Sequence, residues 1–109
     1  MSFEDVFNLL GLCYRARRLV VGEEACRQAI RSGKAELVLV CHSASPNTLH
    51  RYESMCYGQN IKLCVLPDTH ELGPFLGKPS AKAVAILDKG FAEGLNHKLC
   101  DSFSGVGCK

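Results

Sequence analysis

Four histidines and seven cysteines are the side chains of this sequence best suited to metal binding or nucleophilic chemistry. The histidines occupy positions 42, 50, 70 and 97, and neither an HxxxH or HExxH pair nor a CxxC motif occurs. These are the ligand spacings that zinc sites need. His42 stands between Cys41 and Ser43 after a buried strand, and is the best candidate for a nucleophilic cluster. We favour the alternative, a strand-end histidine packed for structural reasons.

Residues 73–80 approach the phosphate-binding pattern GxxxxGK[ST]. Their spacing is one residue short, Pro79 replaces the hydroxyl that would bind a metal, and a strand follows where a helix is needed. Asp88 is better interpreted as a helix cap than as an acid catalyst, and no carboxylates are paired at a useful spacing. The sequence therefore predicts a protein that is not an enzyme and takes no cofactor, no metal and no small-molecule substrate.

The cysteines do not suggest a disulfide framework. Their number is odd, and the acidic start Met-Ser-Phe-Glu-Asp is not typical of a secretion signal. Cys26 and Cys41 lie in apolar patterns, where a free cysteine behaves as a small hydrophobic residue. We therefore expect free thiols and a cytoplasmic location. No apolar run approaches the roughly 20 residues of a membrane helix, so no membrane partner is expected.

The alternation of apolar patterns predicts a single α/β domain. Helices are expected over residues 3–14, 22–33, 45–58 and 88–95, and strands over 19–21, 37–41, 61–66 and 83–87. A short helix is expected between Asp68 and Pro74. Short connections between alternating helices and strands predict a helix–sheet–helix sandwich over residues 1–95. Residues 96–109 show no period and are predicted to be a flexible tail.

Basic residues are concentrated in one segment, although the whole chain carries only +2. The segment from Cys13 to Lys34 contains six cationic residues and only two acidic residues, Glu23 and Glu24. The six are Arg15, Arg17, Arg18, Arg27, Arg31 and Lys34. If the fold gathers this excess of positive charge on one face, that face attracts phosphate groups. The alternative is an arginine-rich surface that only contacts solvent.

Two features suggest where an anionic partner would bind. Short connections should place the helix that opens at Gly22 beside the loop from Lys78 to Lys82. Free N–H groups at the helix N-terminus and the lysine charges would then hold a nucleic-acid backbone. Glu23 and Glu24 repel phosphate, but a glutamate accepts hydrogen bonds from the amino and imino groups of bases.

Several runs together resemble the kink-turn-binding ribosomal protein family, which includes large-subunit proteins seven-Ae and thirty-e. They are LLGLCYRARRLVVGEEACRQAIRSGKAELVLV, SASPNT, ELGPFLGK and AVAILDKGFA, and the bacterial YlxQ-like branch is the most similar. The resemblance implies a three-layer α/β/α sandwich with a four-stranded mixed sheet, and a ribosomal or ribosome-associated protein that binds kinked RNA. It places the RNA contacts on residues 22–28 and 78–82.

The sequence departs from the family at the RNA-reading helix. Strong binders in the family carry Asn-Glu there and a lysine three residues later, whereas Glu24, Ala25 and Gln28 stand here. These differences argue against tight kink-turn binding and leave open a protein-interaction module on the same fold. Compensating phosphate contacts are expected from three arginines. The full set of expected RNA-binding residues is Arg17, Arg18, Gly22, Glu23, Glu24, Arg27, Gln28, Lys78 and Lys82.

Overall fold

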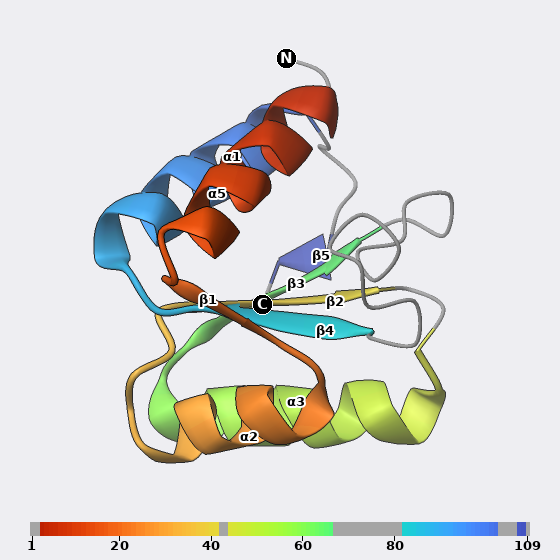
Figure 1. The fold of residues 1–109 in the computed structure, drawn as a ribbon. Helices are drawn as coiled ribbons and strands as arrows, with labels where there is room; N and C mark the ends of the chain where they lie inside the picture. The colour runs from red at the N-terminus through yellow and green to blue at the C-terminus, as the bar shows by residue number, and fades with distance from the viewer. Residues whose placement is uncertain (1–2, 42–43, 67–81, 103–106, 109) are drawn as a thin grey trace.

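The computed structural model describes residues 3–41, 44–66, 82–102 and 107–108. In chain order the elements are α1 (Phe3–Arg15), β1 (Leu19–Val21), α2 (Glu23–Arg31), β2 (Leu37–Cys41), α3 (Pro46–Gln59), β3 (Lys62–Leu66), β4 (Ala83–Ile86), α5 (Lys89–Ser102) and β5 (Gly107–Cys108) (Figure 1). The expected elements of the described ranges are present. The short helix predicted between Asp68 and Pro74 lies outside them.

All strands belong to one mixed sheet in the order β1-β4-β2-β3-β5. β2 and β3 are parallel, with Leu37 opposite Lys62, and the remaining neighbours are antiparallel. The predicted four-stranded mixed sheet is confirmed. The two-residue strand β5 extends it at the edge of β3, where Cys64 pairs with Cys108.

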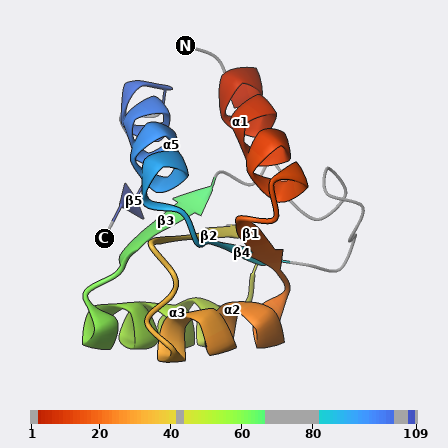
Figure 2. The same ribbon diagram turned by 60° about the vertical axis from the view of Figure 1, so that its left-hand side comes forward.

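Helices cover both faces of the sheet, which confirms the three-layer sandwich (Figure 2). α1 and α5 lie side by side on one face, and α2 and α3 on the other. Side chains of β2 alternate between the two cores, as the pleat of a strand dictates. Leu37 and Leu39 pack in the core under α1 and α5, whereas Val38 and Val40 pack in the core under α2 and α3.

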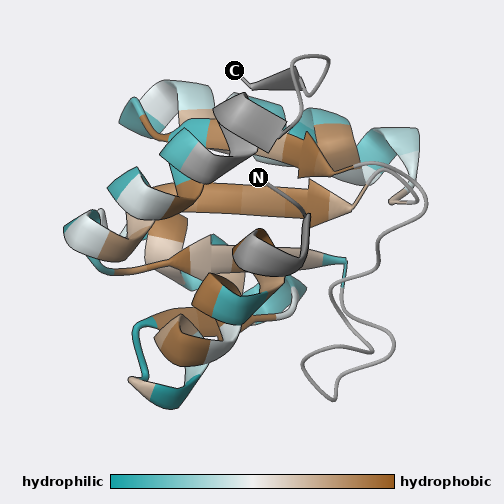
Figure 3. Cartoon of the chain, turned by 90° about the horizontal axis from the view of Figure 1, so that it is seen from above, coloured by the Kyte–Doolittle hydropathy of each residue, from teal (hydrophilic) through white to brown (hydrophobic). Residues whose placement is uncertain are grey.

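Strand β4 is buried throughout, yet its two faces differ in side-chain size. Val84 and Ile86 face α1 and α5, and Ala83 and Ala85 face α2 and α3. Small side chains let the helices on that face approach the sheet closely. Apolar residues dominate the strands, and hydrophilic residues gather on the outer turns of the helices (Figure 3).

The sheet has two ends that matter for function. Arg18 precedes strand β1 and Gly22 follows it. The antiparallel β4 starts beside Gly22 and finishes beside Arg18. We call these the Gly22 end, which also holds the end of β2, and the Arg18 end, which also holds the starts of β2 and β3. Both α2 and α3 begin at the Gly22 end (Figure 1).

Three helices finish at the Arg18 end with the same turn. The left-handed residues are Arg17 after α1 (φ 59°), Gly33 after α2 (φ 76°) and Asn60 after α3 (φ 58°). In each turn the next residue's N–H bonds to the carbonyl five residues back, as Arg18 does to Cys13 at 3.0 Å. Lys34 repeats this bond at 3.0 Å, and Ile61 at 2.8 Å. This is the Schellman arrangement, which satisfies helix carbonyls that lack an internal partner.

The end of the chain differs from its prediction. Regular structure was expected to stop at residue 95, but α5 runs to Ser102. Residues 96–102 contain neither glycine nor proline, so nothing interrupts the helix once the buried part around Leu95 has nucleated it. The domain boundary at residue 95 stays a prediction. Within the described residues, no helix combines the length and the apolar character needed to span a bilayer.

Candidate nucleic-acid interface

Helix α2 begins at a glycine whose backbone no other residue adopts easily. Gly22 has φ 102° and ψ 158°, a conformation that side chains strongly disfavour. Its N–H donates to the Ala83 carbonyl at 3.0 Å, and its own carbonyl accepts from the N–H of Cys26 at 3.0 Å. Among the described residues, no atom outside the chain neighbours of Gly22 lies within 4 Å of the place where a Cβ would stand. The glycine therefore sets the start of the helix and leaves the space beside it open.

The N-termini of α2 and α3 differ in how they are capped. On α3, the Ser45 hydroxyl accepts the N–H of Thr48 at 3.2 Å. The N-cap residue of α2 is Gly22, which has no side chain to make such a bond. The first N–H groups of a helix have no partner within the helix, so those of α2 are available to an external acceptor. Glu23 and Glu24 in the first turn complement the helix dipole.

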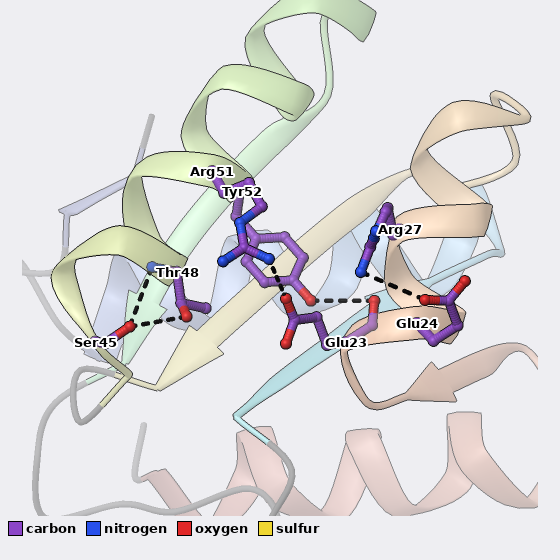
Figure 4. Close-up of polar contacts among 7 residues, drawn as sticks. All are labelled: Glu23, Glu24, Arg27, Ser45, Thr48, Arg51 and Tyr52. Atoms are coloured by element: carbon purple, nitrogen blue, oxygen red, sulfur yellow. Dashed lines mark hydrogen bonds and ion pairs between the residues drawn. The ribbon is translucent and has the colours of Figure 1, made fainter.

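Glu23 is held against α3 (Figure 4). Arg51 Nη1 lies 2.5 Å from its carboxylate, and the buried Tyr52 donates its hydroxyl to the Glu23 carbonyl at 3.4 Å. Burial, followed by the neighbouring Cys26 and Glu23, raises the pKa of Tyr52 well above its ordinary value, so this donor stays protonated. Sequence analysis missed Arg51 and Tyr52, because only the packing of α3 beside α2 brings them to this end.

Glu24 is the freer of the two acids. Its side chain is 72% exposed, against 48% for Glu23. It contacts Arg27 at 3.4 Å, one turn along the same helix, and such exposed pairs contribute little stability. Gln28 is exposed one turn beyond Glu24. Glu24, Arg27 and Gln28 therefore present polar groups along the outer side of α2, with Glu24 the available acceptor.

Arg27 carries an incompletely bonded guanidinium. Its Nε is buried and, within the part of the chain that the structure describes, has no hydrogen-bond partner. The side chain as a whole is 31% exposed. Buried donors are nearly always paired, and an anionic acceptor makes the strongest bond to a guanidinium. An external phosphate can reach only the exposed part of this side chain, since the Nε itself is buried.

Of the loop predicted to lie beside Gly22, only its last residue, Lys82, is described. The Lys82 carbonyl accepts the N–H of Cys41 at 2.8 Å, and the next carbonyl, of Ala83, accepts the N–H of Gly22 at 3.0 Å. Lys82 is thus placed at the Gly22 end. Lys78 lies outside the described residues.

Arg17 and Arg18 are not brought to this site. They form the turn between α1 and β1, and the Arg18 carbonyl accepts the N–H of Leu87 at 2.7 Å, at the far end of β4. Both arginines are exposed. The structure therefore divides the expected RNA-binding residues between the two ends of the sheet.

The cysteines of the described core are poor nucleophiles. Cys13, Cys26 and Cys56 are buried free thiols, and Cys41 and Cys64 are also buried. Burial, with a further contribution from Asp88, raises the pKa of Cys13 to about 11. Burial likewise raises the pKa of Cys26 to about 12 and that of Cys56 to about 11. Thiols with such pKa values stay protonated at neutral pH and are unreactive. His42 and Ser43 lie outside the described residues.

Fold and site together define an α/β/α domain with an open helix N-terminus at one end of a mixed sheet. The chain belongs to the ribosomal protein L7Ae/L30e/S12e/Gadd45 family, whose model matches residues 4–96. The resemblance seen in the sequence is thereby confirmed.

Individual relatives agree with this assignment. The chain is 37% identical over 95 residues to the RNA-binding protein YlxQ of Bacillus subtilis (strain 168), covering 87% of this chain and 95% of the relative. It is 34% identical over 90 residues to RNA-binding protein YlxQ of Enterococcus faecium, covering 83% and 86%. A solved structure from Bacillus halodurans C, of a protein with unknown function, superposes with a TM-score of 0.77 at 30% identity, covering 84% of this chain and 93% of that one.

Proposed function

We propose that this protein binds RNA at the Gly22 end, recognises a sharply kinked RNA, and acts in the cytoplasm on or near the ribosome without catalysing a reaction. Membership of a ribosomal protein family and two relatives named as RNA-binding proteins support the RNA partner. The main observation that supports this site is the start of α2 at Gly22, which has no side chain to cap the helix. The exposed Glu24 lies next to it, and Lys82 lies at the same end of the sheet.

Each residue at this end has a distinct proposed role. The open space at Gly22 lets an RNA backbone approach the free N–H groups of α2. Glu24 accepts hydrogen bonds from guanine amino and imino groups, while Glu23 stays engaged with Arg51 and holds α2 against α3. Arg27 and Lys82, joined in the proposal by Lys78, contact phosphates, and Gln28 contacts a base or sugar.

One observation favours a second candidate, a protein-interaction module on the same fold. Ala25 and Gln28 replace residues that strong kink-turn binders of the family carry, and two carboxylates stand at the helix start. A basic or polar protein surface would satisfy those carboxylates as well as RNA bases do. The two candidates differ in their response to kink-turn RNA.

The test measures binding of purified protein to a kink-turn RNA with sheared G·A pairs and to a plain RNA duplex. Glu24→Gln should weaken kink-turn binding by about 1–3 kcal/mol, because the amide cannot accept as many base hydrogens, and should barely affect the duplex. Glu93→Gln is the matched control, since Glu93 is an exposed acid on α5, which lies on the other face of the sheet. It should leave both affinities unchanged.

A gain-of-function variant completes the test. Combining Ala25→Glu with Gln28→Lys should move the site toward the family's strong binders and tighten kink-turn binding. If wild type and this double variant both ignore kink-turn RNA at low salt, the Gly22 end does not bind kinked RNA. The protein-interaction module then replaces the present proposal.

A further inference from the structure

The Arg18 end of the sheet presents a row of cations. Four turns succeed one another there in the sheet order β1-β4-β2-β3. The first carries Arg17 and Arg18, the second Lys89, the third Lys34 and the fourth Lys62. All five side chains are exposed. Neighbouring strands lie about 4.8 Å apart, so the turns span roughly 15 Å.

Two further arginines and few acids complete this surface. Arg15 and Arg31 close the last turns of α1 and α2 at the same end. The turns hold seven cations and two carboxylates, Glu36 and Asp88, and the latter caps α5 by accepting the Phe91 N–H at 2.9 Å. Because the whole chain carries only +2, the remainder of the molecule must be net negative. The positive charge of the protein is therefore concentrated at the Arg18 end.

We propose that the Arg18 end is a second RNA-binding surface, which holds the phosphate backbone of an RNA segment other than the one bound at the Gly22 end. The inference rests on the proposed function, since it takes RNA to be the partner of the protein. β2 spans both ends with five residues, roughly 17 Å of extended chain, so the two surfaces can be occupied together. The protein would then bridge two RNA segments.

Structural roles account for only two of these cations. Arg15 and Arg31 stabilise the C-terminal dipoles of their helices, but Lys89 lies in the first turn of α5, where a cation opposes the dipole. Arg17 occupies a left-handed position that glycine fills more easily. Within the described residues, no ion pair involves any of the seven; the described pairs are those of Arg27 and Arg51. A surface kept basic without internal partners suits an external polyanion.

A groove next to this row favours RNA over an acidic protein as the polyanion. His50, Glu53, Tyr57, Asn60 and Lys62 are among the residues that line it. The Tyr57 side chain is 89% exposed. An exposed aromatic ring beside a lysine suits stacking of an unpaired base next to its phosphate. Acidic protein segments offer carboxylates to the lysine but no planar base to the ring.

The test asks whether the two ends bind RNA independently. Kink-turn RNA is tethered to a surface, protein is loaded at low salt, and a labelled plain RNA duplex is added. In a parallel arm the protein itself is tethered and receives the duplex directly. The variant Arg18→Gln with Lys34→Gln is compared with Asn8→Glu plus His97→Glu, which lowers the net charge equally at exposed positions of α1 and α5.

The wild type and the charge-matched control should capture the duplex in both arms. The Arg18/Lys34 variant should load onto kink-turn RNA normally yet capture the duplex at least about tenfold more weakly. Its plot of log affinity against log salt should be shallower by roughly 0.7–0.9 for each phosphate that the variant no longer neutralises.

Each alternative result has a definite meaning. Equal duplex capture by the variant and its control overturns the second surface while leaving kink-turn recognition intact. Failure to load onto kink-turn RNA, with Arg18- and Lys34-dependent duplex capture in the parallel arm, overturns recognition at the Gly22 end and supports the second surface. Capture of poly-glutamate but not of duplex RNA overturns the inference and assigns the surface to an acidic protein partner.

Discussion

Among single residues, Arg17 is the most informative, because its backbone and its side chain favour different amino acids. Three helices finish in equivalent turns, and the left-handed residue is glycine in one, asparagine in another and arginine in the third. Glycine and asparagine are the usual occupants of this conformation. An arginine there costs about 1–2 kcal/mol in backbone energy relative to a right-handed residue. The proposed second RNA-binding surface would give this charge a role that offsets the backbone cost.

The first prediction follows from this conflict. Arg17→Gly should leave the melting temperature unchanged or raise it by a few degrees, because relief of the left-handed backbone offsets the greater freedom of glycine when unfolded. The same change should weaken binding of duplex RNA at low salt. Arg17→Lys is the matched control, since it keeps a positive charge at the same left-handed position, and should leave RNA binding intact. A clear fall in stability for Arg17→Gly would show that the arginine is structural.

Glu23 and Glu24 are adjacent and identical in the sequence, but their side chains have different surroundings in the structure. Both were expected to contact RNA at the helix start, but Glu23 is engaged by Arg51 and Glu24 is the more exposed of the two. Arg51 stands 28 residues away from Glu23 in the chain. No local pattern reveals such a contact, because it depends on how α2 and α3 pack.

At the scale of elements, helix starts and stops were readable from the sequence. Glycines bound α2 on both sides, at Gly22 and Gly33, and Ser45 and Asp88 cap α3 and α5 as predicted. Each signal works through local backbone geometry, so no tertiary information is needed. The continuation of α5 to Ser102 escaped prediction because residues beyond 95 carry no apolar period.

The path of the chain explains why the candidate site was only partly predicted. Residues 13–34 form one basic segment in the sequence, but β1 carries the chain from the Arg18 end to the Gly22 end and α2 brings it back. Arg17, Arg18 and Lys34 therefore lie at the Arg18 end. Gly22, which falls between them in the sequence, lies at the opposite end of the sheet. Grouping by sequence placed these residues in one site, whereas the strand separates them.

The second prediction concerns the start of α2. Gly22→Ala should destabilise the fold by about 1–3 kcal/mol, because alanine at φ 102° is strained although space for its methyl group is available. For a domain of this size each kcal/mol corresponds to roughly 4–8 °C in melting temperature. Gly58→Ala is the matched control within α3, where alanine also meets no atom of the described residues within 4 Å and its backbone is ordinary helix. That change should stabilise the protein by up to about 1 kcal/mol. Equal melting temperatures for the two variants would contradict the assigned geometry.

At the scale of the whole molecule, alternating apolar patterns were sufficient to predict the three layers, whereas the strand order was not derivable from them. The mixed sheet was expected from the family resemblance, and its fifth strand was not expected. The two ends of the sheet differ in charge. Among the described residues, the Gly22 end holds Glu23 and Glu24 near cations, whereas the Arg18 end is strongly basic. A bridging RNA-binding protein needs such separated surfaces, because one continuous basic face would bind a single RNA segment.

Both cores also contain thiols whose ionisation opposes folding, which leads to the last prediction. Cys13 lies in the core under α1 and α5, and Cys26 and Cys56 lie in the other core. Burial raises the pKa of Cys13 to about 11 from a reference value of 9.0, and that of Cys56 likewise to about 11 from 9.0. The folded state therefore holds these protons more tightly than the unfolded chain. The resulting stability is fully present below pH 9 and is lost as the pH rises from 9 through 11.

The melting temperature should accordingly fall steeply above pH 9, with each such thiol removing roughly 1 kcal/mol of stability per pH unit. Cys56→Ala should make this fall shallower, because it removes one ionising group from the core under α2 and α3. Val38→Ala, in the same core, is the control. It should lower the melting temperature at every pH by leaving a cavity, and keep the wild-type dependence on pH. An unchanged alkaline slope for Cys56→Ala would show that exposed lysines or tyrosines, rather than the buried thiols, govern stability in that range.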